Sequence, residues 1–165
     1  MKRITNITYA AFALLALASL ALSPTARAQL NPPPDGGYPG GNTAEGDNAL
    51  FSLTTGSYNT ANGLGTLYYN TTGSNNTAGG VDALYYNYSG SYNTANGFLA
   101  LTYNENGSDN TANGAYALYL NFSGSGNTAN GFEALFHNGT GSNNTANGAS
   151  ALHNNAGSGN TANGV

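Results

Sequence analysis

The sequence contains no cysteine and only three basic residues. The absence of cysteine excludes disulfide bonds and thiolate metal ligands. The basic residues are Lys2, Arg3 and Arg27, so the chain beyond position 27 has neither lysine nor arginine. It therefore has no lasting positive charge with which to neutralise phosphates, which excludes nucleic acid as a partner and argues against direct binding to an anionic bilayer.

The first 28 residues have the features of a secretory signal peptide. Lys2 and Arg3 precede an apolar run of 13 residues, Ala10 to Leu22, and Ala26-Arg27-Ala28 has the small-x-small pattern of a cleavage site. The run is shorter than the roughly 20 residues that a membrane span needs. We therefore expect cleavage before Gln29 and export of a mature chain whose seven acidic residues give it a formal charge of about −7.

The rest of the chain divides into a short linker and a long repeat. Residues 29–41 are rich in proline and glycine and lack apolar periodicity, which predicts an extended linker. From residue 42 to 165 a motif of the type Asn-Thr-Ala-Asn-Gly returns every 17 residues, apart from one final step of 16. Its eight copies begin at Asn42, Asn59, Asn76, Asn93, Asn110, Asn127, Asn144 and Asn160. A fixed short period predicts small units that stack on their neighbours.

Other side chains recur in phase with the motif and form columns. Leucine recurs at Leu50, Leu67, Leu84, Leu101, Leu118, Leu135 and Leu152. The next position is aromatic in six of seven repeats: Phe51, Tyr68, Tyr85, Thr102, Tyr119, Phe136 and His153. A third column is apolar throughout: Leu64, Val81, Phe98, Ala115, Phe132 and Ala149. Gly closes each motif and Asn usually follows the aromatic pair, and we expect these two residue types to supply the positive φ of the corners.

These columns predict an all-β fold, a parallel β-solenoid of 17-residue rungs. Asn-Thr-Ala-x has the composition and length of a short strand, whereas the arm that contains Ala-Leu fits either a strand or a single helical turn. Rungs about 4.8 Å apart would place equivalent asparagines in amide ladders and equivalent rings in stacks. Because one leucine per rung makes a thin core, we infer that several chains share it.

The pattern Asn-Thr-Ala-x-Gly-x-x-Ala-Leu-x-x-Asn-x-Thr-Gly-Ser resembles the head repeats of YadA-type trimeric autotransporter adhesins, and it is similar to repeats of phage tail-fibre-like proteins. The resemblance covers roughly residues 41–165. It implies a left-handed β-roll, a homotrimer, and adhesion to host proteins or cells at the bacterial surface, either outer membrane-associated or extracellular.

The chain departs from this family in two respects. The residue before the closing Gly is commonly aliphatic in the family and mostly Asn here. If this residue faces inward, asparagine amides of successive rungs would have to hydrogen-bond to each other in ladders. No stalk, membrane barrel or chaperone domain is recognised before Val165. We therefore expect a truncated product or a short secreted relative.

No residue pattern indicates catalysis, a cofactor or a metal site. His137 and His153 lie in neighbouring columns without further ligands, so we interpret them as substitutions among aromatic residues. Asp82 and Glu133 share a column but lie three rungs apart, roughly 14 Å, which is too far for a glycosidase carboxylate pair. We expect a non-enzymatic protein.

Six tyrosines are the candidate surface-binding residues: Tyr58, Tyr69, Tyr86, Tyr92, Tyr103 and Tyr116. Regularly spaced tyrosines beside Asn and Thr can bind a glycan or a host protein. The interpretation we favour is that their rings fill a trimer interface or cover the core.

The leading functional hypothesis is an adhesin-like surface protein or fibre segment. The alternative is a monomeric secreted solenoid that binds polysaccharide, ice or mineral through a Thr/Asn/Tyr face, which the threonine of each motif suggests.

Overall fold

The computed structural model describes residues 38–164. The expected signal peptide, residues 1–28, and residues 29–37 of the expected linker lie outside this range. The last linker residues join the first rung, because Tyr38 and Asn42 pair as an antiparallel bridge with N–H to O distances of 2.8 and 3.3 Å. Tyr38 also packs against the core.

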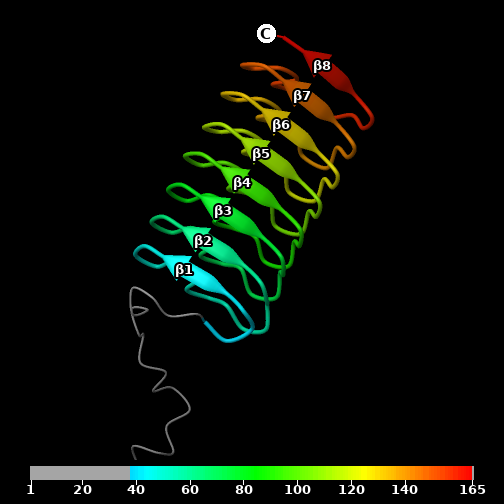
Figure 1. Ribbon diagram of the computed structural model, residues 1–165. Coiled ribbons are helices and arrows are strands. Elements are labelled where there is room, and N and C mark those ends of the chain that lie inside the picture. Colours follow the sequence, from blue (N-terminus) through cyan, green and yellow to red (C-terminus); the bar gives the residue numbers. More distant parts are fainter. Residues whose placement is uncertain (1–37, 165) are drawn as a thin grey trace, which may run out of the picture. The chain divides into compact units, whose positions relative to one another are not determined.

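Eight strands of three residues stack into one parallel sheet, one strand per rung (Figure 1). They are β1 (Thr43–Glu45), β2 (Thr60–Asn62), β3 (Thr77–Gly79), β4 (Thr94–Asn96), β5 (Thr111–Asn113), β6 (Thr128–Asn130), β7 (Thr145–Asn147) and β8 (Thr161–Asn163). Equivalent residues pair directly, with Thr43 opposite Thr60 and Ala44 opposite Ala61. The predicted all-β parallel solenoid with a 17-residue period is therefore confirmed.

Side chains alternate along each strand as the pleat requires. In β4, Ala95 is buried, while Thr94 and Asn96 lie on the outer side, and the asparagine before the strand, Asn93, is fully buried. The position before the closing Gly thus faces outward, and the core does not have to accommodate it. From Asn96 onward the asparagines at this position form an outer amide ladder, which begins with Asn96 Nδ2 donating to Asn113 Oδ1 at 3.1 Å.

The arm that contains Ala-Leu is neither a strand nor a helical turn. It is a series of tight turns in which each leucine from Leu50 to Leu152 has a φ between 51° and 53°, in the left-handed region. In a typical rung the Thr66 N–H donates to the Gly63 carbonyl at 3.3 Å, and the Leu67 N–H donates to Ala83 of the next rung at 3.0 Å. The left-handed conformation costs a non-glycine residue roughly 1–2 kcal/mol. Complete burial of the leucine side chain, worth about 1.5–3 kcal/mol, offsets that cost.

The expectation that the asparagine after the ring pair supplies the positive φ of a corner was wrong. Leucine and a mixed set of residues take positive φ alongside glycine, whereas the asparagines after the ring pair, such as Asn70 and Asn87, do not. They are buried instead, and Asn87 Nδ2 donates to Asn70 Oδ1 at 2.8 Å and to the Gly90 carbonyl at 2.8 Å. Their side-chain amides, rather than their backbone freedom, explain why asparagine recurs there.

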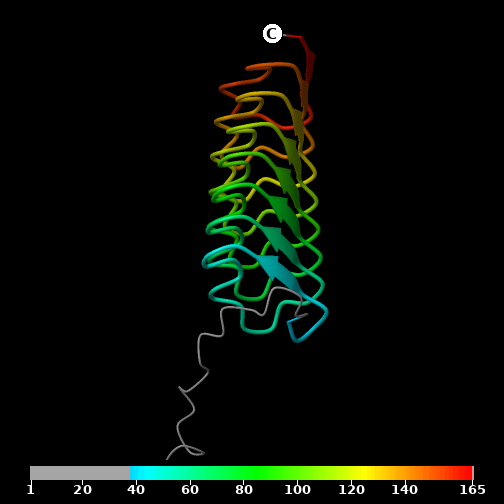
Figure 2. The same cartoon turned by 60° about the vertical axis from the view of Figure 1, so that its left-hand side comes forward.

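The core is closed within a single chain. A typical rung contributes two alanines, one leucine and two asparagines, with Thr66 in place of one alanine in the second rung and Leu53 in place of one asparagine in the first. The leucines from Leu67 to Leu135 have no exposed surface. In the described residues every buried side-chain nitrogen or oxygen has a hydrogen-bond partner. The expectation of a core too thin for one chain was wrong, because ladders of buried amides fill the space that aliphatic side chains leave. In Figure 2 the strands line one side of the solenoid and the loops form the rest.

Candidate functional site

The third column identified in the sequence is an exposed apolar strip, here called the apolar column: Leu64, Val81, Phe98, Ala115, Phe132 and Ala149. It follows the closing glycine of the second to seventh motifs, where the chain leaves the strand. Leu64, Phe98 and Phe132 are 49%, 46% and 51% exposed. Ala115, which is small and half-buried, separates Phe98 from Phe132. Large apolar side chains gathered on a protein surface mark interaction sites.

Next to this strip lie two columns of stacked rings. The first ring column contains Phe51, Tyr68, Tyr85, Tyr119, Phe136 and His153, with Thr102 as its one interruption. Phe51 and Tyr68 stack at a centroid distance of 4.9 Å, and Phe136 and His153 at 5.1 Å. The second ring column contains Tyr69, Tyr86 and Tyr103, with centroids 5.3 and 5.0 Å apart.

The apolar column and the two ring columns form one continuous surface, here called the aromatic face. Tyr116 lies edge-on to Phe98 at 5.3 Å and to Tyr119 of the first ring column at 5.7 Å. Tyr68 and Tyr69 are in edge contact across the two ring columns at 4.6 Å. Edge contacts of this kind and offset stacks each contribute about 0.5–1.5 kcal/mol beyond the burial of area.

The six candidate tyrosines do not form one stripe, because the structure places them in three columns. Tyr69, Tyr86 and Tyr103 form the second ring column, and Tyr116 links the apolar column to the first ring column. Tyr58 and Tyr92 belong to a separate column at the corner before the strand, where they are 69% and 63% exposed. Of the six, only these two present most of their ring surface to solvent.

The ring columns change the acidity of their phenols. Burial raises the pKa of Tyr85 and Tyr86, and neighbouring tyrosines add to the shift because ionised phenols repel each other. Burial also raises the pKa of Tyr119, with a smaller contribution from its hydrogen bond to Tyr103. These phenols are therefore neutral hydrogen-bonding groups at physiological pH.

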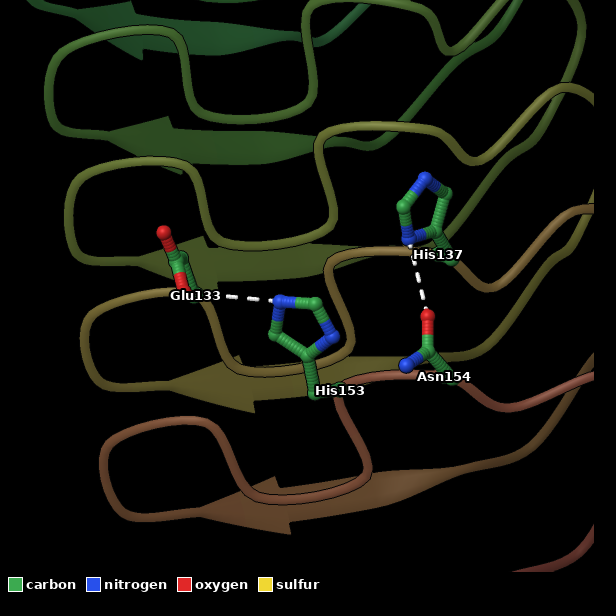
Figure 3. Close-up of polar contacts among 4 residues, drawn as sticks. All are labelled: Glu133, His137, His153 and Asn154. Carbon is green, nitrogen blue, oxygen red and sulfur yellow. Dashed lines mark hydrogen bonds and ion pairs between the residues drawn. The ribbon is translucent and has the colours of Figure 1, made fainter.

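The two histidines do not converge on a common point (Figure 3). His153 Nε2 lies 3.4 Å from Glu133 Oε2, whereas His137 Nδ1 lies 3.0 Å from Asn154 Oδ1. His153 stacks on Phe136 with an angle of 6° between the rings, so it takes the place of an aromatic residue in its column. Within residues 38–164 no group of three or more His, Asp or Glu side chains is arranged to hold a metal ion.

The outer side of the sheet, here called the strand face, carries two parallel rows of polar side chains. One row consists of the motif threonines from Thr43 to Thr161, which are exposed or half-buried. The other is the outer amide ladder, in which Asn113 Nδ2 donates to Asn130 Oδ1 at 2.9 Å. Because the strands pair in register, both rows repeat regularly from rung to rung.

The only break in the period produces a local feature that the sequence pattern did not identify. Asn155 Nδ2 donates to Asn138, 17 positions earlier, but the Ser142 N–H donates to Ser158, only 16 positions later. Ala156 alone therefore occupies the corner that Gly139 and Thr140 form one rung before. A shallow hollow of about 420 Å³ opens there. The final 16-residue step was the signal that could have located it.

No helix in the described part of the chain has the length and apolar character needed to cross a bilayer. Comparison with known proteins finds no matching family model, no matching curated protein and no matching solved structure.

Proposed function

We propose that the chain is an exported, non-enzymatic, adhesin-like repeat protein of the bacterial surface, whose solenoids associate as homotrimers through the aromatic face. The observation that carries this proposal is the apolar column, in which Leu64, Val81, Phe98 and Phe132 remain exposed although each chain has a closed core of its own. The left-handed sense of the coil, the trimeric state and the bacterial surface location come from the family resemblance and belong to this proposal.

Charge also supports association between copies of the chain. The apolar column itself, from Leu64 to Ala149, contains no charged residue, although Asp47 precedes it in register and the carboxylates of Asp82 and Glu133 lie in the neighbouring column that Tyr116 shares. Most of the strip therefore buries no unpaired charge on contact with a second copy, which would be costly. The tyrosine hydroxyls of the ring columns can bond at the rim of such an interface, where polar groups are common.

Light scattering of the purified secreted chain tests the oligomeric state. A mass three times that of the chain supports the proposal, and a stable monomer contradicts it. The double variant Phe98→Ser/Phe132→Ser should dissociate the trimer, whereas Tyr92→Ser, at the separate corner, should leave it intact. Adhesion of beads coated with each variant to host cells or matrix then shows whether binding depends on the assembly.

The strand face supports a second candidate, a monomeric secreted solenoid that binds polysaccharide, ice or mineral. Its two regular rows of Thr and Asn favour recognition of a repeating surface. However, the amides of the outer ladder already bond to each other, which leaves the threonines as the free row. Thermal hysteresis and polysaccharide pull-down measurements, compared between the chain and Thr94→Tyr/Thr128→Tyr, separate this candidate from the first.

A further inference from the structure

The hollow at the C-terminal rungs has an apolar wall and a polar wall. Its apolar wall includes Leu120, Phe122 and Ala156, and its polar wall includes His137, Thr140 and Asn154. Its volume of about 420 Å³ lies at the lower end of the roughly 300–1,000 Å³ range of small-molecule sites. A wall of each kind suits a ligand with both C–H and hydroxyl surfaces.

Phe122 presents an unoccupied ring to this hollow. It is 41% exposed, and among the described residues it stacks on no other aromatic ring. In the ring columns, by contrast, each ring covers the face of its neighbour at about 5 Å, as Tyr86 and Tyr103 do at 5.0 Å. The next residue in the column of Phe122 is Gly139, and a methyl group placed on its Cα would meet no atom within 4 Å. This part of the surface is thus open for stacking.

Among the described residues, the polar wall has hydrogen-bonding atoms without a partner, and a bond between two of its side chains holds those side chains in place. His137 Nδ1 and Asn154 Oδ1 bond to each other, which fixes both side chains on adjacent rungs (Figure 3). Within residues 38–164, His137 Nε2, Asn154 Nδ2 and Thr140 Oγ1 make no hydrogen bond. At the floor of the hollow, Asn155 donates to the buried Asn138 at 3.1 Å and so continues the column of asparagines that includes Asn70 and Asn87.

The electrostatic surroundings select against anionic ligands. Glu105 stands one rung before Phe122 in the same column, and no lysine or arginine occurs after position 27. A carboxylate or sulfate in the hollow would have no lysine or arginine partner to offset its loss of hydration. An uncharged ligand has no such cost.

We infer that the hollow binds one sugar ring of a neutral glycan. The C–H face of the sugar would lie on Phe122, and its hydroxyls would bond to His137 Nε2, Asn154 Nδ2 and Thr140 Oγ1. Tyrosine and phenylalanine rings beside amide groups provide this combination of contact area and hydrogen bonding. The assignment rests on the proposed adhesive function, for which it names the class of ligand, but it does not depend on the trimer.

NMR titration of the isotope-labelled secreted chain tests the inference. The probes are galactose, N-acetylglucosamine and lactose as neutral sugars, and N-acetylneuraminic acid and glucuronic acid as anionic ones. We expect at least one neutral sugar to shift the signals of Phe122, Gly139 and Asn154, with no comparable shift from the anionic sugars. Absence of binding by all three neutral sugars, or equal binding of the anionic sugars, overturns the inference.

Variants locate the binding. Phe122→Ala should weaken binding about tenfold or more, which corresponds to the loss of one ring contact. Tyr88→Ala is the matched control, because Tyr88 is an exposed ring in the same column two rungs earlier, and it should leave binding unchanged. Ala156→Tyr should fill the hollow and abolish binding. Full binding in Phe122→Ala or in Ala156→Tyr contradicts the inference.

The experiments distinguish failure of the glycan-site inference from failure of the proposed adhesive function. Coated beads that adhere to cells while no sugar binds in solution would remove only the glycan site. Sugar binding without adhesion would leave the hollow assigned and remove the adhesive role.

Discussion

Asn93 Oδ1 accepts two hydrogen bonds from Asn110 of the next rung, one from its backbone N–H at 3.0 Å and one from its side-chain Nδ2 at 3.1 Å. Asn93 Nδ2 in turn donates to the Gly107 carbonyl at 2.9 Å. One buried amide therefore connects two strands of the stack and a loop. Asn42, Asn59 and Asn110 accept the same two bonds, whereas Asn76 and Asn127 accept only the backbone N–H of the next motif asparagine.

Removal of this amide should destabilise the stack. Asn93→Ala leaves the buried N–H of Asn110 without a partner and opens a gap beside it, so we expect a loss of about 2–4 kcal/mol in the free energy of unfolding. Asn96→Ala is the matched control, because Asn96 belongs to the outer ladder and is exposed; its loss should be about 0.5 kcal/mol or less. Urea unfolding followed by circular dichroism measures both. Equal effects of the two substitutions would contradict the stabilising role of the buried motif asparagines.

The left-handed leucine predicts an unusual response to substitution. Leu101 has a φ of 52° and is fully buried, and its N–H donates to Ala117 at 2.9 Å. Leu101→Ile keeps the volume but puts a β-branched residue in the left-handed region, so we expect a loss of about 1–3 kcal/mol. Leu101→Met, unbranched at Cβ, should cost less than about 1.5 kcal/mol. Thermal unfolding measures the stability of both variants. An isoleucine variant as stable as the methionine variant would argue against the left-handed conformation of residue 101.

Two glycines of neighbouring rungs should respond in opposite ways. Gly97 has a φ of 143°, and a Cβ there would lie 2.5 Å from the Gly114 carbonyl oxygen. Gly97→Ala should therefore destabilise the fold by more than about 2 kcal/mol. Gly79 takes the place of an outer-ladder asparagine, and the nearest atom to its Cβ would be Asn96 Oδ1 at 3.3 Å. Gly79→Asn should extend the ladder toward Asn62 and stabilise the fold by a few tenths of a kcal/mol to about 1 kcal/mol.

Alkaline pH should loosen the ring columns. Folding raises the pKa of Tyr85, Tyr86 and Tyr119 above the ordinary value of 10.0, so the stability that their neutral phenols contribute is complete below about pH 10 and is lost as the pH rises through the folded-state pKa. The variant with phenylalanine at all three positions should lose less stability than the parent between about pH 9 and pH 12. Tyr92→Phe, at an exposed ring, should follow the parent. Urea midpoints measured across this range make the comparison, and identical slopes for all three proteins would show that the columns do not couple to ionisation.

The regularity of the sequence was sufficient to predict the rung, its period and the parallel register. Repetition of Asn-Thr-Ala requires that equivalent residues lie above each other, and Thr43 opposite Thr60 is the direct result. The conformation of the leucine arm was not predictable, because leucine in isolation disfavours positive φ and adopts it here only through burial and a bond to the next rung. Burial of the motif asparagines, and therefore a core closed within one chain, depended on the same stacking geometry.

The candidate site was predictable only in part. Sequence columns identified the rings and the apolar strip, but not which of them faces solvent, since an outward row and an inward row have the same period. Tyr58 and Tyr69 illustrate the difficulty: both recur in phase with the repeat, yet they lie at different corners. The hollow beside Phe122 arises from the loss of a single residue near Ala156, which the final 16-residue step marks in the sequence without showing that a hollow forms there.

Stacking of the rungs in register is the central claim, and the absence of cysteine permits a direct test of it. Spin labels on Thr60→Cys and Thr161→Cys, both exposed and six rungs apart, report one distance in the purified chain diluted with unlabelled chain. A spacing of about 4.8 Å per rung predicts a narrow electron-paramagnetic-resonance distribution centred near 29 Å, apart from the length of the labels. A broad distribution, or a centre displaced by more than about two rungs' spacing, would contradict the stacked solenoid.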